Sequence, residues 1–244
     1  MIKFFRRIRQ NLLTENKFSK YLIYAIGEII LVVLGILIAL SINNWNDNRK
    51  NRIAEQKLYK TLIEILEGDL EDVRSKTKIL DSAIVGQEIF ITESFESVKS
   101  RLTDTEIINL INKVAYTSYS FVPNISLYNK IVQNNEIDLI QSEELQRKVI
   151  DLYEVQYWEY KDLDNTLEHL AQEGLTSNFF GDISHMYIQN TLEINPESFG
   201  KHYVELSKDC RKIYFLSITV KKSMLNCENK IIALLPLLRN ELNK

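Results

Sequence analysis

Few residues of this 244-residue chain combine the types and the spacing that chemistry requires. His169 and Glu173 stand four residues apart, where one face of a helix could offer both to a metal ion. Two ligands do not make a site, and a solvated helix face explains the same pair. The sequence contains no zinc-protease, CxxC, GxSxG, Walker A or GxGxxG pattern. It therefore predicts no metal, no cofactor and no catalytic residue, and indicates a protein that is not an enzyme.

Two clusters of side chains invite a functional interpretation and have a simpler one. Four carboxylates lie close together, Glu67, Asp69, Glu71 and Asp72. They fit a wet helix surface, because the glycine-bearing loop of an EF-hand is missing. Four aromatic residues form the second cluster, Tyr153, Tyr157, Trp158 and Tyr160. We expect them in the core of a long helix, since tyrosine can bury its ring and keep its hydroxyl in water.

The two cysteines, Cys210 and Cys227, both fall in one predicted helix. Seventeen residues of helix span roughly 25 Å, whereas a disulfide requires Cα atoms within about 7 Å. We therefore expect two buried free thiols. A disulfide between two chains is the alternative, because an extracytoplasmic domain would permit it.

One acid, Glu28, lies inside a stretch of residues 21–42 that is otherwise uncharged. Residues 23–42 would form about 30 Å of helix, which matches the hydrocarbon core of a bilayer. Tyr21 and Tyr24 would mark one interface and Trp45 the other. The sequence therefore predicts a transmembrane helix over residues 21–42.

Small residues accompany this acid on one face of the predicted span. At about 100° per residue, Gly35 and Ala39 fall within about 20° of Glu28, and Tyr24 flanks them. Gly35 and Ala39 make a small-xxx-small pair, which allows helices to approach closely. The pattern predicts a contact between transmembrane helices through this face. The alternative is that Glu28 lies near the cytoplasmic interface and reaches water there.

Charge is distributed unevenly on the two sides of the span. Residues 1–20 hold six basic residues against Glu15, and residues 43–244 hold 24 basic and 31 acidic residues. This bias predicts a cytoplasmic N-terminus and an extracytoplasmic domain over residues 43–244, and it argues against nucleic-acid binding. Basic side chains are expected on anionic lipid in an amphipathic segment over residues 1–20, namely Lys3, Arg6, Arg7 and Arg9. A topogenic tail and a cleaved signal peptide are the alternatives.

The rest of the chain has the pattern of long helices. Only seven glycines and three prolines interrupt it. Apolar residues at spacings of three and four predict a stalk helix over about 46–92 and a bundle over about 100–244, with a coiled coil as the alternative packing. Thr103, Asn124 and Ser142 should cap helices, Gly174 should end one, and Pro236 should kink or end the last. The irregular segment 175–200 is a possible binding surface.

The N-terminal segments "FFRRIR", "NKFSKYLIYAIGEI" and "ALSINNWN" resemble the signature of a family of uncharacterised membrane proteins from Bacteroidetes-type bacteria. The resemblance is specific over residues 1–48 and looser further on. It implies a single-pass protein of the bacterial inner membrane with helical character. It implies no activity and no functional residues.

These observations predict an all-α protein, in which an N-terminal transmembrane helix continues into a stalk and an extracytoplasmic helical bundle. The leading functional hypothesis is a membrane-anchored binding or scaffold protein. The second is an accessory or regulatory subunit of a membrane complex that assembles through Glu28, Gly35 and Ala39. An enzyme with a site in segment 175–200 is the third. The expected partners are the lipid bilayer and either a second copy or another membrane protein.

Overall fold

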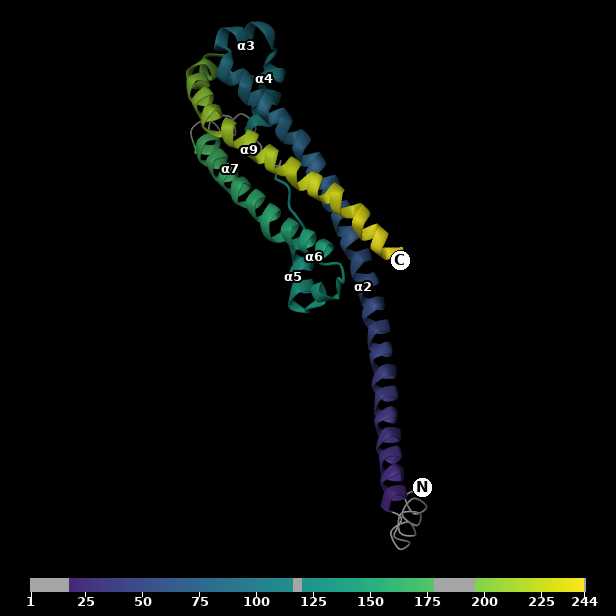
Figure 1. Ribbon diagram of the computed structural model, residues 1–244. Helices are drawn as coiled ribbons and strands as arrows, with labels where there is room; N and C mark the ends of the chain where they lie inside the picture. Colours follow the sequence, from purple (N-terminus) through teal and green to yellow (C-terminus); the bar gives the residue numbers. More distant parts are fainter. Residues whose placement is uncertain (1–17, 116–119, 178–195, 244) are drawn as a thin grey trace. The chain divides into compact units, whose positions relative to one another are not determined.

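A computed structural model describes residues 18–115, 120–177 and 196–243 of the chain (Figure 1). Most of these residues are helical and none of them is in a strand, which confirms the predicted all-α fold. The chain forms two compact units, Met1–Ala54 and Glu55–Lys244.

Helix α2 (Phe18–Thr92) is 75 residues long and contains no proline. In the first unit its large apolar side chains from Ile29 to Ile42 are exposed, with Leu31 68% exposed. Among the described residues, one helix is long and apolar enough to cross a membrane, and it is the Ala25–Thr92 part of α2. In the second unit one face of α2 is buried from Leu58 onward, with its buried apolar side chains at spacings typical of a helix face, while Ile79 and Val85 are exposed.

Helix α9 (Pro196–Leu242) supplies the longest buried row of side chains. Its members are spaced alternately three and four residues apart over five seven-residue repeats. All of them are buried: Tyr203, Leu206, Cys210, Ile213, Ser217, Val220, Met224, Cys227, Ile231, Leu234 and Leu238. Such a row repeats every 3.5 residues and remains on one face of a gently supercoiled helix. Both cysteines lie in this row as free, buried thiols, as the sequence predicts.

Helix α9 runs antiparallel to the part of α2 in the second unit (Figure 1). The Tyr203 hydroxyl near the start of α9 donates to the Glu93 carbonyl, and Arg239 near its end pairs with Glu67. Between them, Arg74 pairs with Glu228 at 2.7 Å and Lys221 pairs with Asp81. The partners on α2, Glu67, Arg74 and Asp81, are spaced seven residues apart. Because exposed ion pairs add little stability, these pairs fix the register of the two helices more than they stabilise them.

A third long element packs antiparallel to α9. It consists of α6 (Glu143–Ile150), a π-helical turn η2 (Asp151–Gln156) and α7 (Tyr157–Ser177). Lys230 of α9 pairs with Asp151 at 2.6 Å. The core of the second unit is therefore shared by α2, α7 and α9.

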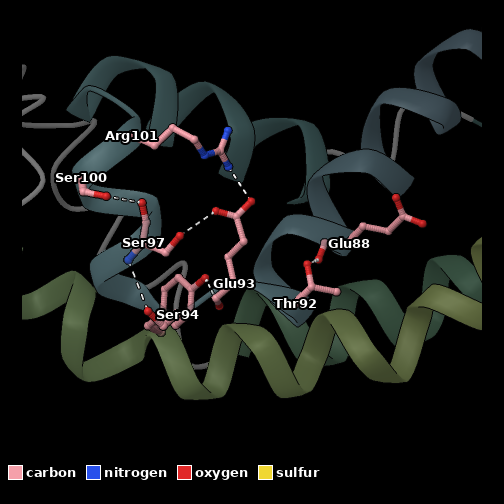
Figure 2. A network of polar contacts seen from close by, with 8 residues as sticks. Glu88, Thr92, Glu93, Ser94, Ser97, Ser100 and Arg101 are labelled. Carbon is pink, nitrogen blue, oxygen red and sulfur yellow. Dashed lines mark hydrogen bonds and ion pairs between the residues drawn. The ribbon is translucent and has the colours of Figure 1, made fainter.

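The chain turns sharply after α2 and enters two short helices, α3 (Phe95–Arg101) and α4 (Asp104–Ala115). Figure 2 shows the polar contacts at this turn, where the Glu93 carboxylate accepts from Arg101 at 2.6 Å and from the Ser97 hydroxyl at 3.2 Å. The Ser94 hydroxyl caps α3 by accepting from the Ser97 amide. Arg101 holds the pKa of the Glu93 carboxyl below its usual range.

Two of the predicted caps are confirmed. Thr103 and Glu106 form a capping box, in which the Thr103 amide donates to the Glu106 carboxylate at 2.8 Å. Ser142 caps α6 by accepting from the Leu145 amide. Asn124 precedes α5 (Ile125–Gln133) at the cap position, but its side chain makes no capping hydrogen bond there.

Two predicted helix ends are wrong. Helix α7 continues past Gly174 to Ser177, since a glycine inside a helix costs only about 1 kcal/mol. Helix α9 continues past Pro236 to Leu242, so the proline does not end the helix, and that it kinks the helix stays a prediction. Buried leucines on both sides of the proline keep the row packed. Helix α9 begins at Pro196, inside the segment 175–200 that the sequence predicts to be irregular, and proline suits the first turn of a helix.

Gly86 is the point where α4 approaches α2 closely. A Cβ atom there would lie 2.6 Å from Cγ2 of the buried Val114 and 3.4 Å from Cδ1 of Leu110. At Gly68 of the same helix, a Cβ atom would meet no described atom within 4 Å. The two glycines therefore have opposite roles.

We expect Gly86→Ala to lower the free energy of unfolding by about 1 kcal/mol, because overpacking by about 1–3 kcal/mol exceeds the helix propensity that alanine adds. Gly68→Ala is the matched control and should raise the free energy of unfolding by up to about 1 kcal/mol. Thermal and urea unfolding followed by circular dichroism measure both. Equal stabilisation by the two substitutions would show that α4 does not approach α2 at Gly86.

Candidate functional site

The structure places the residues of the predicted transmembrane contact on α2. Glu28, Gly35 and Ala39 lie in one unbroken α-helix, so they share a face as the spacing requires. Gly35 and Ala39 are exposed, and Glu28 is partly buried. Tyr24 is in the same helix, but its side chain lies outside the described residues.

Two other predicted regions fall largely outside the described residues. One is the set of basic side chains Lys3, Arg6, Arg7 and Arg9. The other is most of segment 175–200, of which residues 178–195 are not described. Its last residues, from Pro196, form the first turn of α9.

The His169 and Glu173 pair lies on the solvated face of α7. The ring nitrogen Nδ1 and the carboxylate are 3.7 Å apart, and both side chains are about 70% exposed. Over residues 18–115, 120–177 and 196–243, no group of three or more His, Cys, Asp and Glu side chains could hold a metal ion.

A cluster of polar contacts forms where segment 120–124 meets α2 and α7. On the α2 side, Asp69 accepts the Asn124 amide at 3.1 Å through Oδ1 and the Tyr157 hydroxyl at 2.8 Å through Oδ2. Asp72 accepts the Val122 amide at 3.3 Å. We name this contact the strap site, and it comprises segment 120–124 and the side chains that hold it.

Helix α7 holds the other side of the strap site. The Tyr160 hydroxyl oxygen accepts the Phe121 amide at 2.6 Å, and Asp164 accepts the Ser120 hydroxyl at 3.1 Å. The Phe121 ring packs against Tyr157 and Tyr160, with centroids 5.7 and 5.4 Å apart. Two helices therefore bind one irregular segment through its backbone amides, and on the α7 side this satisfies the amide of the buried Phe121, which would otherwise lack a partner.

Burial dominates the electrostatics of the strap site. It raises the pKa of the Asp164 carboxyl to about 6 and raises that of Asp69 above its usual value, although hydrogen bonds from Ser120 and Tyr157 oppose these shifts. It also raises the pKa of Tyr157 and Tyr160 far above 10. The tyrosines are therefore neutral donors, and the carboxylates depend on them for solvation.

Tyr153 occupies the core beside the strap site. Its ring stacks on Tyr128 with centroids 4.3 Å apart and planes 4° apart. Its hydroxyl is buried and has no hydrogen-bond partner among the described residues. The Tyr128 hydroxyl instead donates to Glu154 at 3.0 Å.

The π-helical turn η2 supplies Tyr153 and directly precedes Tyr157. Such a turn holds one extra residue and shifts the following side chains around the helix. At the end of this turn, the Cys227 thiol donates to the Gln156 backbone carbonyl, with 3.7 Å between sulfur and oxygen. Burial raises the pKa of the Cys227 thiol to about 12, so this thiol is a weak donor rather than a nucleophile.

Sequence reasoning identified part of this site. The prediction that the aromatic cluster packs in the core is confirmed for Tyr153, Tyr157 and Tyr160, but it is wrong for Trp158, which is 65% exposed. The prediction of a wet acidic surface is wrong for Asp69, which is buried because it binds Tyr157 and Asn124. The aspartate-to-amide contacts join residues about 50 positions apart, and no local pattern in the sequence marks them.

We expect Tyr157→Phe to lower the free energy of unfolding by about 1–3 kcal/mol, because it removes a donor from the buried Asp69 carboxylate. Tyr153→Phe is the matched control. It removes a buried hydroxyl without a described partner, so stability should be unchanged or rise by up to about 1 kcal/mol. Urea unfolding of both variants measures the difference, and equal losses would indicate a bound water on Tyr153.

Comparison with known proteins assigns the chain to a family without adding a function. No curated protein and no solved structure matches it. A family model matches residues 28–195, which is more than half of the chain and includes most of α2, the strap site and α7. The chain belongs to the DUF6090 family, a family of unknown function.

Proposed function

We propose that this protein is a single-pass, membrane-anchored helical protein whose second unit is a binding or scaffold module outside the cytoplasm. The observation that supports it is the contrast along α2. Large apolar side chains from Ile29 to Ile42 are all about half exposed or more, whereas most of those from Leu58 onward are buried or half-buried, with Ile79 and Val85 as the exceptions. An apolar surface of this length is stable in hydrocarbon and not in water.

The proposed orientation rests on charge. Six basic residues precede the apolar segment within residues 1–20, and an excess of Lys and Arg beside a membrane span favours the cytoplasmic side. The acidic surplus of residues 43–244 then lies outside. The resemblance of the N-terminal signature supports a bacterial inner membrane as the location.

The proposed role is binding rather than catalysis. Carboxylates and tyrosines of the strap site bind the chain's own backbone, and the Cys210 and Cys227 thiols are buried. The seven-residue repeat of α9 and its row of ion pairs with α2 support an antiparallel coiled coil as the rigid part of the module. Rigid helices of this kind present their outer faces to a partner.

The anchor is tested in cells with a tag at each end of the chain. We expect the protein to remain in membranes after carbonate extraction, and added protease to remove the C-terminal tag of spheroplasts while sparing the N-terminal tag. Leu34→Arg with Leu37→Arg should release the protein, since each charge costs about 3 kcal/mol at the bilayer centre. Extraction of the unaltered chain by carbonate would contradict the anchor, and early loss of the N-terminal tag would indicate a cleaved signal.

A second candidate role is assembly within the membrane, as an accessory or regulatory subunit. Gly35 is exposed on the same face of α2 as Glu28 and Ala39, and a Cβ atom added to it meets no described atom within 4 Å. A neighbouring helix could approach closely there, and Glu28 could hydrogen-bond to it.

A reporter of transmembrane association that carries residues 18–48 tests this role. Gly35→Leu should abolish the signal, because added bulk separates the helices. Ser41→Leu makes a similar change on the opposite face and should preserve it. Loss of signal with both variants, or with neither, would exclude this face as the contact.

A further inference from the structure

Helix α9 has a second apolar row, on the side that faces solvent. Val204, Ile218, Leu225 and Ile232 follow one another at multiples of seven residues and are 38–60% exposed. Phe215 lies beside them and is 77% exposed. A surface helix normally has polar residues at such positions. The seven-residue spacing matches that of the buried row, and it is typical of a face that packs against another helix.

This face carries positive charge only. On a wheel of about 100° per residue, Lys208, Arg211 and Lys222 lie within about 60° of Phe215. No Asp or Glu between residues 204 and 233 lies within that arc. We name this the basic face, and it comprises Lys208, Phe215, Ile218, Lys222 and Leu225.

Helix α7 has a solvent face of the opposite charge. Trp158 is 65% exposed and Val155, in the preceding turn η2, is 41% exposed. Glu159 and Asp162 are exposed beside them. No Lys or Arg of α7 lies within about 60° of Asp162 on the wheel. We name this the acidic face, and it comprises Val155, Trp158, Glu159 and Asp162.

We propose that a second copy of this chain covers α9, with the basic face of one copy against the acidic face of the other. The inference rests on the proposed binding role and names the partner. An exposed tryptophan and phenylalanine would form the apolar centre, and charges of opposite sign would surround it, as in protein interfaces generally. Pairing of α9 with α9 of another copy would instead place Lys208 and Lys222 near the lysines of that copy, and like charges repel.

The contact joins two different faces, so it is heterologous. Such contacts close into a ring or extend into a row of copies. Confinement of all copies to one membrane raises their effective concentration, so a modest interface suffices.

Two charge-reversed versions of the full-length chain test the proposal. The first carries Lys208→Glu and Lys222→Glu, which replaces two of the three positive charges named on α9 by negative ones. The second carries Glu159→Lys and Asp162→Lys, which makes both positions basic. All altered side chains are exposed, so folding should be preserved, and circular dichroism checks it. Energy transfer between fluorophores at the C-terminus reports association in membrane vesicles.

We expect energy transfer between copies of the unaltered protein. In each reversed version alone, energy transfer should fall to the level of an unrelated single-span protein. It should return when the two versions are mixed. Recovery on mixing cannot arise from misfolding. Lys78→Glu, on the exposed surface of α2, is the matched control and should keep full transfer. Transfer in the unaltered protein should also fall with added salt.

Three results would overturn the proposal. They are no transfer in the unaltered chain, full transfer in either reversed version alone, and no recovery on mixing. The first would indicate that another protein or the chain itself covers α9, and the second would indicate association through a different surface, such as the transmembrane face. Carbonate extraction of the same vesicles shows separately whether the anchor is intact.

Discussion

Packing of the α9 row against α2 and α7 is the constraint on which the second unit depends. Eleven side chains, from Tyr203 to Leu238, are buried on one face of a single helix. Burial of apolar surface supplies most of the free energy of folding, and a row this long removes apolar surface along nearly the whole helix. The row cannot shift by one residue without exposing its members. The positions of α2 and α7 follow from it.

Polar contacts then select one arrangement among the apolar packings that are possible. The ion pairs Arg74 with Glu228 and Lys221 with Asp81 fix the register of α2 and α9. At the strap site, the buried Asp69 and the half-buried Asp72 accept backbone amides of segment 120–124, so the amides of an irregular segment are paired where it packs on the helices. These groups are partners of the chain itself, and the surface that remains for other molecules is the outer side of the helices.

The strap site and the two glycines of α2 show why local reasoning ends where it does. In the sequence, Gly68 and Gly86 both predict a weak point in a helix. The position of Val114 in the folded chain leaves no room for a side chain at Gly86, whereas Gly68 has no such neighbour. Asp69 and its acidic neighbours likewise read as one solvated cluster. Asp69 alone is buried, because Tyr157 and segment 120–124 approach it from elsewhere in the chain.

The sequence by itself determined the helical class, the long apolar segment, the caps at Thr103 and Ser142 and the two free thiols. These depend on residues within about one turn of each other, or on composition, so a linear pattern contains them. The tertiary structure decided which acid is buried, where η2 shifts the tyrosines, and that α9 runs through Pro236. It also decided that Trp158 is exposed. Each of these depends on contacts between residues far apart in the chain, and their balance of burial and hydrogen bonding exists only once the helices have packed.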